Sequence, residues 1–516
     1  MELREEELRA VDVRAAEREH GARGPSRRAA SSRRGAEKTM RFPSDPFIDG
    51  AWRSVSTRAP IRAPYDDALV DEVGLASARD LDDALRAGAR AEHAMRARPL
   101  HARRALLART ARLIVEHAES LARLIAREAA KPIALARVEV ARAATTFTLA
   151  HDALAASRDR ALPLDVTASG EGRYGVVKQR PRGLALAITP FNFPLNLVAH
   201  KVAPALAAGC PVIVKPADQA PLTALALAAL LEEAGAPPGA VQVVPTTRAL
   251  AGALVDDDRT RVLSFTGSSS VGFMLRARAA RKHTVLELGG DAAVVVCADS
   301  DVVAAADKVA RGAFAYAGQV CISVQRVLVD ARVRAPFVDA LVAAARALVT
   351  GDPLVDDTVV SALIDDAAKA RVTEWIDEAT TKGARAVLSS TTHAGGARRA
   401  LTPCVLEGVP ESARLAREEA FGPVCVIDTF RSIDEAAARV NASRFGLQTG
   451  IFTDSMKDLW RFSDLAEVGA VIHDDVPTFR VDHMPYGGVK DSGRGREGLP
   501  DAISDYEEPR LLVLRA

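Results

Sequence analysis

Three residues of this 516-residue chain have side chains and positions that could carry chemistry. Cys321, in YAGQVCISVQR, offers a thiol that becomes a nucleophile when it ionises. Glu287 ends the predicted strand TVLEL just before two glycines, where parallel-sheet proteins place their functional groups. Asn192, in TPFNFPLN, lies between prolines that stiffen its loop and hold its side-chain amide in place. Taken singly, each has an ordinary structural interpretation: a buried cysteine, a capping or salt-bridged carboxylate, and a turn asparagine.

A second group of residues is typical of nucleotide binding. SFTGSSSVG places Gly267 and Gly272 at a strand-to-helix turn, where glycines let a diphosphate approach the N–H groups of a helix N-terminus. VIVKPADQ puts Lys215 just past a strand end, positioned to donate to ribose hydroxyls, with Asp218 nearby as an acceptor. The Gly-x4-Gly spacing differs from the G-x-G-x-x-G fingerprint, so these residues alone do not identify a dinucleotide site.

The elements that would position these residues follow from hydrophobic patterning. Beyond Gly183, short apolar strands (PVIVK, AVQVV, RVLSF) alternate with Ala-rich and Leu-rich helices, which predicts a parallel sheet covered by helices on both faces. A second α/β region follows from Gly289–Gly290, with helices near 301–317 and 333–348 and strands at RVLVD and VCVIDTF. Upstream, apolar residues from His101 to Lys131 gather on one face and predict an amphipathic surface helix.

Two further segments are strand candidates outside the main core. RYGVVKQRPRG alternates as a strand or arm, and PRLLVL is a candidate terminal strand. A terminal strand with an unpaired edge often adds to the sheet of a second copy. We therefore expect a homodimer or homotetramer.

Composition excludes several classes of partner and site. Lys and Arg number 68 against 67 Asp and Glu, a formal net charge of +1, so there is no basic excess for a nucleic acid or an anionic membrane. Five cysteines with no CxxC pair indicate neither a disulfide framework nor a metal site. The uncharged run 183–198 is interrupted by prolines and asparagines, which argues against a membrane span. We expect a cytoplasmic protein.

Residues 1–39 have a composition unlike the rest of the chain. They contain no aromatic residue and carry ten Lys or Arg against eight Asp or Glu. Transit peptides are poor in acidic residues and secretory signals need an apolar stretch, and this segment has neither property. We expect a disordered extension, with Met40 as a plausible true start.

Together, these residues make the chain resemble the aldehyde dehydrogenase superfamily from about residue 40 onward. The resemblance rests on seven motifs in the family's order: TPFNFP, VIVKPAD, SFTGS, LELGG, GQVC, EEAFGP and HMPYGGVKDSG. It implies an α/β fold with a Rossmann-type parallel-sheet NAD-binding domain, a second α/β catalytic domain and a small β oligomerisation arm. The implied division is a nucleotide-binding domain at 40–163 and 183–288, a catalytic domain at 289–488, and the arm with the C-terminal segment at 164–182 and 489–516.

The same resemblance implies a role for each site residue. Cys321 would be the nucleophile, Glu287 the general base and Asn192 the oxyanion donor. Lys215 and Glu419 would bind the two riboses of NAD or NADP, with Phe421 beside the nicotinamide. The full implied cofactor set is Thr189, Pro190, Phe191, Lys215, Asp218, Thr266, Gly267, Ser268, Gly272, Leu288, Glu419 and Phe421.

Departures from the family pattern bear on the product and the cofactor. Members that transfer the acyl group to coenzyme A usually lack the glutamate of LELGG, so Glu287 favours a free carboxylic acid as product. Asp218 stands where a longer Glu is common. A carboxylate there would repel a 2′-phosphate and favours NAD, but the shorter side chain leaves room for NADP.

The ending VPTFRVDHMPYGGVKDSG resembles the branch of lactaldehyde, non-phosphorylating glyceraldehyde-3-phosphate and phosphonoacetaldehyde dehydrogenases. Phosphonoacetaldehyde enzymes tend to carry Arg before the nucleophile, and Val320 here disfavours a phosphonate. Arg480 and His483 would contact a substrate carboxylate or hydroxyl, or else make structural hydrogen bonds. The implied pocket set is Phe193, Leu197, Val320, Ile322, Arg480, His483 and Tyr486.

The leading hypothesis is therefore an NAD(P)-dependent enzyme that oxidises a small aldehyde, hydroxylated or acidic, to its acid. The reaction would pass through a thiohemiacetal and a thioester on Cys321. Two alternatives stay open: a coenzyme A-acylating aldehyde dehydrogenase, and a non-catalytic scaffold that binds nucleotide.

Overall fold

The computed structural model describes residues 42–156, 159–391 and 397–515. The segment 1–39 and the start expected at Met40 lie outside these residues. The described chain is an α/β protein with two largely parallel sheets, which confirms the predicted fold class. Within it, no helix is both long and apolar enough to cross a membrane.

The first sheet has eight strands in the order β2-β1-β9-β8-β7-β10-β11-β21. The five strands from β9 to β11 are parallel, and the pairings at both edges are antiparallel. The chain runs from β7 outward through β8 to β9 and then returns to place β10 beside β7, so the strand order reverses between β7 and β10. The bounds are β1 (Phe47–Ile48), β2 (Ala51–Trp52), β7 (Ala185–Ile188), β8 (Val212–Lys215), β9 (Val241–Val243), β10 (Val262–Gly267), β11 (His283–Leu288) and β21 (Gly493–Arg494).

Helices cover both faces of this sheet because alternate strand residues point in opposite directions. On β7, Ala185 and Ala187 pack toward helices α2 to α6, whereas Leu186 packs with α1, α7 and α8. The helices are α1 (Ala78–Ala97), α2 (Leu100–Glu116), α3 (Ala118–Ala129), α4 (Ile133–Ala153), α5 (Asn196–Ala208), α6 (Leu222–Glu233), α7 (Arg248–Asp256), α8 (Ser269–Arg278) and α14 (Asp501–Asp505).

The second sheet has seven strands in the order β14-β15-β16-β13-β12-β18-β19, all parallel except for β14. Val294 and Val296 of β12 pack toward α9, α10 and α11, and Val295 packs toward α12 and α13. The strands are β12 (Ala293–Val296), β13 (Arg326–Asp330), β14 (Arg385–Leu388), β15 (Cys404–Glu407), β16 (Val424–Phe430), β18 (Gln448–Phe452) and β19 (Ala470–His473). The helices are α9 (Val302–Phe314), α10 (Arg334–Ala347), α11 (Asp366–Thr381), α12 (Ile433–Asn441) and α13 (Met456–Leu465).

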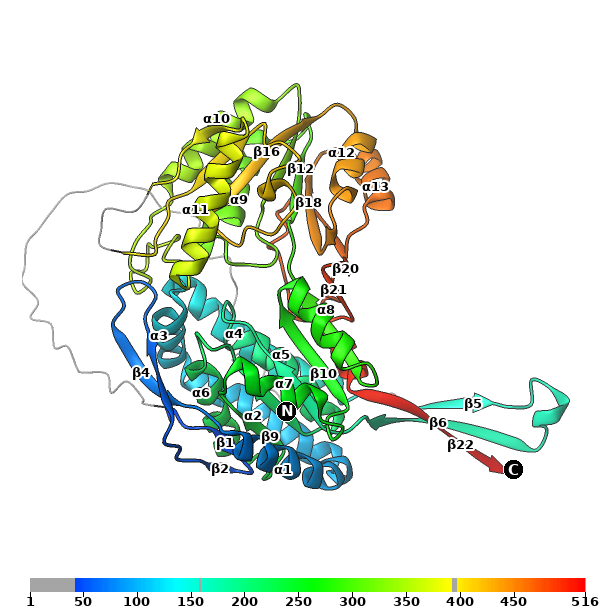
Figure 1. Ribbon diagram of the computed structural model, residues 1–516. Helices are drawn as coiled ribbons and strands as arrows, with labels where there is room; N and C mark the ends of the chain where they lie inside the picture. Colours follow the sequence, from blue (N-terminus) through cyan, green and yellow to red (C-terminus); the bar gives the residue numbers. More distant parts are fainter. Residues whose placement is uncertain (1–41, 157–158, 392–396, 516) are drawn as a thin grey trace, which may run out of the picture. The chain divides into compact units, whose positions relative to one another are not determined.

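A third, antiparallel sheet joins β5 (Arg160–Pro163), β6 (Arg173–Pro181) and β22 (Glu507–Arg515) into a long ribbon (Figure 1). Its edge strand β22 exposes a run of apolar side chains from Leu511 to Leu514. Smaller elements are the pairs β3 (Arg58–Arg62) with β4 (Leu69–Gly74) and β17 (Phe445–Gly446) with β20 (Val489–Lys490), and the 3₁₀ turns η1 (Ala168–Gly170), η2 (Ala315–Gly318) and η3 (Arg414–Ala416).

One expectation about these elements is wrong. The single surface helix predicted from His101 to Lys131 is two helices, because the backbone leaves helical geometry at His117 and both α2 and α3 then pack against α4 and α6. Strand β5 lies outside the expected arm segment 164–182 but pairs with β6. Within 489–516, β21 pairs with β11 of the first sheet, so only β22 of that segment joins the ribbon.

Candidate active site

Cys321 lies on a tight turn that follows α9 and η2. Tyr316, Ala317 and Gly318 all have left-handed backbone angles, with φ of 55°, 53° and 68°, which turn the chain out of the helix. A Cβ at Gly318 would lie 2.2 Å from the main-chain oxygen of Gly422, so this turn requires glycine. The helix predicted at 301–317 therefore ends at Phe314, and the thiol is partly buried rather than at a fully exposed turn.

Asn192 connects the loop after β7 to the turn that carries the thiol. Its side-chain Nδ2 donates a hydrogen bond of 3.0 Å to the main-chain oxygen of Gln319, two residues before Cys321. The side chain is buried, and an amide nitrogen carries two protons, so one N–H remains for another acceptor. The structure thus brings the predicted oxyanion donor to the loop of the predicted nucleophile.

Glu287 lies at the end of β11 with only 3% of its surface exposed. Neither carboxylate oxygen has a hydrogen-bond partner within the described residues. Burial, together with the negative charge of Glu497, raises the pKa of Glu287 well above 4.5, while Lys201, Arg480 and Arg496 oppose that shift. A buried carboxyl with both oxygens free is poised to accept a proton.

Two charged residues next to Glu287 were missed by the sequence analysis. Glu497 is buried, 3.5 Å from Nζ of Lys201 and 2.8 Å from Nη2 of Arg480, and these cations hold its pKa down to about 2. Lys201 lies inside α5, whose residues are all buried. The signal that could have revealed Lys201 is its charge within the apolar run LVAHKVAPALAA.

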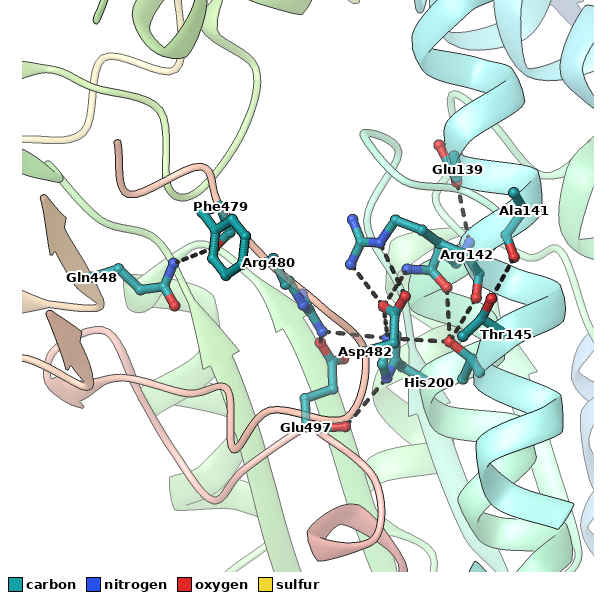
Figure 2. A network of polar contacts seen from close by, with 12 residues as sticks. Glu139, Ala141, Arg142, Thr145, His200, Gln448, Phe479, Arg480, Asp482 and Glu497 are labelled. Atoms are coloured by element: carbon teal, nitrogen blue, oxygen red, sulfur yellow. Dashed lines mark hydrogen bonds and ion pairs between the residues drawn. The ribbon is translucent and has the colours of Figure 1, made fainter. Parts of the chain in front are cut away.

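The predicted substrate partner Arg480 is already engaged in a polar network (Figure 2). It donates to Glu497, lies 3.4 Å from His200 and stacks on the ring of Tyr486 at 3.7 Å. His200 in turn contacts Asp482, which also accepts a 2.7 Å bond from Arg142. This geometry favours the structural alternative for Arg480.

The other predicted pocket residues do not all gather in one place. Val320, Ile322 and Tyr486 gather around Cys321 with Leu447 and Met484. Leu197 is buried in the first turn of α5, and His483 is exposed on its loop. The ring of Phe193 lies 3.3 Å below Nζ of Lys131, so its main polar contact is a buried cation.

Lys131 belongs to a buried ion pair that is hydrogen bonded to the end of the Asn192 loop. Lys131 pairs with Glu139, and both side chains are buried. The other oxygen of Glu139 accepts the main-chain N–H groups of Leu195 and Asn196, at 2.9 and 3.1 Å, where α5 begins. Burial lowers the pKa of Lys131 to about 8, and the charge of Glu139 opposes that shift. Lys131 and Glu139 were also missed, because nothing local shows that they pair.

The residues predicted to bind a dinucleotide surround the point where the strand order reverses. Thr189, Pro190 and Phe191 follow β7, and Thr266, Gly267 and Ser268 end β10 and begin α8. Crevices at such reversals, outside the carboxyl ends of parallel strands, are where open α/β sheets bind ligands. A Cβ at Gly272 would lie 2.4 Å from the Leu288 side chain, so glycine there lets α8 pack close to β11.

Two observations indicate that these residues fit a dinucleotide. The hydroxyl of Thr266 is buried without a hydrogen-bond partner in the described part of the chain, although a ligand could supply one. Ser268 leaves the N-terminus of α8 without a side-chain cap, so its backbone donors stay available for a diphosphate.

The predicted ribose ligands come from different parts of the fold, one at the end of a strand in the first sheet and one in the loop before β16 of the second. Lys215 ends β8 and pairs with Asp218, whose second oxygen is 3.2 Å from Nε of Arg248. Glu419 accepts a 3.1 Å bond from the Gly290 N–H, and burial raises its pKa to about 7.

Phe421, predicted to lie beside the nicotinamide, has a left-handed φ of 48°. Its ring meets Phe191 edge to face, with 5.9 Å between the ring centroids. Such backbone angles are uncommon for an aromatic residue and persist where surrounding structure enforces them, often at ligand sites. Within the described residues, no group of three or more His, Cys, Asp or Glu side chains is arranged to hold a metal ion.

Known proteins are similar to this chain over nearly all of its described residues. The model of the aldehyde dehydrogenase family matches residues 52–512. A 3-sulfolactaldehyde dehydrogenase of Priestia aryabhattai is 36% identical over 472 residues, covering 91% of this chain and 97% of the relative. A lactaldehyde dehydrogenase of Methanocaldococcus jannaschii is 35% identical over 476 residues, covering 91% and 99%. The crystal structure of an NADP-dependent glyceraldehyde-3-phosphate dehydrogenase from Bacillus halodurans, complexed with NADP, superposes with a TM-score of 0.88 at 32% identity, covering 92% of this chain and all of that one.

Proposed function

Since the chain belongs to the aldehyde dehydrogenase family, we propose that it oxidises a small aldehyde to the free carboxylic acid, with Cys321, Glu287 and Asn192 as its catalytic residues. The predicted enzyme class and the predicted use of NAD or NADP are confirmed by these relatives. The observation that carries the rest of the proposal is Glu287, a buried carboxyl with both oxygens free. A thioester needs such a base for hydrolysis.

In the first step, the Cys321 thiolate attacks the aldehyde carbon. The sulfur electron pair forms the S–C bond, and the C=O π electrons move onto the oxygen. The second N–H of Asn192, whose first is bonded to Gln319, would donate to this oxygen together with a backbone N–H. Each preorganised donor of this kind contributes about 3–4 kcal/mol to transition-state stabilisation.

A thioester forms once the former aldehyde carbon has lost its hydride. Glu287 then takes a proton from water, and the water oxygen attacks the thioester carbon. The C–S bond then breaks and the acid leaves, at a gain of about 10²–10⁴-fold from base catalysis. Lys215, Glu419 and the N-terminus of α8 would hold a nicotinamide dinucleotide, which when bound supplies the acceptor for the aldehyde hydride.

The substrate proposal is a small hydroxylated or acidic aldehyde. The names of two relatives, 3-sulfolactaldehyde and lactaldehyde dehydrogenase, support it. The mainly apolar residues around Cys321 suit a small carbon chain. We further propose that Asp218 favours NAD over NADP through its negative charge.

A cytoplasmic location and a homodimer or homotetramer stay proposals. The exposed apolar residues of β22 support self-association, because an unpaired edge strand offers backbone groups to a second copy. A monomeric mass by light scattering would overturn this proposal.

The proposal is tested by trapping the acyl intermediate in Glu287→Gln. We expect one equivalent of reduced nucleotide per site, followed by slow turnover, and an acyl adduct on Cys321 in the intact mass spectrum. Glu411→Gln changes an exposed glutamate and should turn over like wild type. Turnover that requires coenzyme A would favour the acylating alternative, and nucleotide binding without turnover of any aldehyde would favour the scaffold.

A further inference from the structure

The hydroxyl group of Tyr486 lies 3.1 Å from the sulfur of Cys321. The tyrosine is 2% exposed, and its side chain packs in a small apolar cluster with Ile322 and Leu447. A buried phenol normally finds one polar partner. Within the described residues, the hydrogen-bond partner of this phenol is the predicted nucleophile itself.

Two contacts with Glu497 hold Tyr486 in this position. The main-chain N–H of Glu497 donates a 2.7 Å bond to the main-chain oxygen of Tyr486. The side chain of Glu497 binds Arg480, whose guanidinium stacks on the tyrosine ring at 3.7 Å. The ring is therefore fixed by its backbone and by a stacked cation.

Four ionisable groups influence the pKa of Cys321, and they act in opposite directions. Burial is the main cause that brings this pKa to about 12, and the charges of Glu419 and Glu287 act in the same direction. The hydrogen bond from Tyr486 lowers the pKa of Cys321 most strongly, and the charge of Arg480 lowers it as well. A nucleophilic thiolate in this site thus depends on its hydrogen-bond donor.

We propose that Tyr486 is a further catalytic residue, whose phenol donates a hydrogen bond to the Cys321 thiolate and so keeps the sulfur ionised and aimed at the substrate. This inference rests on the proposed role of Cys321. The phenol gives up no proton in the step, because burial raises the pKa of Tyr486 well above 10. The thiol proton leaves to solvent, and the sulfur electron pair then forms the bond to carbon.

The test compares the alkylation of Cys321 by iodoacetamide in wild type and Tyr486→Phe across a range of pH. The variant keeps the ring, its packing and its stack on Arg480, and it loses the hydroxyl alone. Mass spectrometry of the Cys321 peptide separates this thiol from the four other cysteines, all buried. Tyr316→Phe is the matched control, since it removes a buried phenol that bonds the main-chain oxygen of Ala129 instead.

We expect alkylation of Cys321 at neutral pH to slow about 10- to 100-fold in Tyr486→Phe, with the midpoint of its pH profile moved upward. Tyr316→Phe should match wild type. Rates are compared below the melting transition of each variant. Equal or faster alkylation in Tyr486→Phe would overturn the inference. The proposed function would still stand in that case, provided that Cys321→Ala is inactive. An active Cys321→Ala would overturn both.

Discussion

The side-chain amide of Asn192 is hydrogen bonded to the main-chain oxygen of Gln319, so the loop after β7 is tied to the turn that carries Cys321. Asn192 follows a strand of the first sheet, whereas Cys321 lies between β12 and β13 of the second. This hydrogen bond therefore links two loops that belong to different sheets. The orientation of the amide is fixed before any substrate arrives, which is how an oxyanion donor becomes effective.

We predict that Asn192→Ala lowers kcat by about 10²–10³-fold, the usual loss for one oxyanion donor. The substitution removes both the donor and the tie to Gln319. KM for the aldehyde should change much less, because the donor acts on charge that develops in the transition state. Steady-state kinetics measure both constants. A rise in KM with unchanged kcat would contradict the oxyanion role.

Removing a negative or a positive neighbour of Glu287 should shift the pH profile of acid formation in opposite directions. A base works when deprotonated, so its raised pKa makes activity fall as pH drops through that value. Glu497→Gln removes a negative neighbour and should lower the pKa of Glu287, moving the acid limb down by about one pH unit. Lys201→Met removes a positive neighbour and should move that limb upward. Shifts in the same direction would contradict this assignment.

Cofactor preference should depend on Asp218 and on the cation beside it. The Arg248 side chain is 82% exposed and offsets the Asp218 carboxylate. Asp218→Ala should raise kcat/KM for NADP relative to NAD by about 10-fold, because it removes a charge that repels the 2′-phosphate. Arg248→Ala should change the ratio in the opposite sense. The ratio is measured with one aldehyde and both nucleotides, and an unchanged ratio in both variants would contradict a role for these charges.

The buried pair of Lys131 and Glu139 predicts a non-additive effect on stability. Glu139→Gln leaves a buried cation without its partner and should cost about 3–5 kcal/mol in free energy of unfolding. Adding Lys131→Met should recover most of that loss, since a buried pair replaced by apolar groups is often neutral. Arg461→Gln, which breaks an exposed pair with Asp434, should change this free energy far less. Urea unfolding measures all three, and a double variant no more stable than Glu139→Gln would contradict the coupling.

Local patterning predicted part of both large sheets. The strands β8, β10, β13 and β16 follow from apolar runs that are visible in the sequence. The break at His117 was missed because no glycine or proline marks it. The places of β5 and β21 were missed because a strand's partner depends on the whole fold and leaves no local signal.

The site was predicted only in part, because contacts between residues far apart in the chain also leave no local signal. Motifs identified Cys321, Glu287 and Asn192, and in the structure a hydrogen bond links the loop of Asn192 to that of Cys321. The charges that tune them, Lys201 and Glu497, are 296 residues apart in the chain and meet only after folding. Tyr486 was predicted as a pocket residue, but the contact of its hydroxyl with the thiol is seen only in the folded structure.

We propose that nicotinamide-dependent oxidation of an aldehyde by this protein requires Cys321 as the nucleophile. The most direct measurement follows nicotinamide reduction by wild type and Cys321→Ala with NAD and with NADP. The aldehydes are glycolaldehyde, lactaldehyde, succinic semialdehyde, glyceraldehyde 3-phosphate and simple alkanals. We predict turnover of a small hydroxylated or acidic aldehyde by wild type and none by Cys321→Ala. Equal turnover by the two proteins would contradict the account.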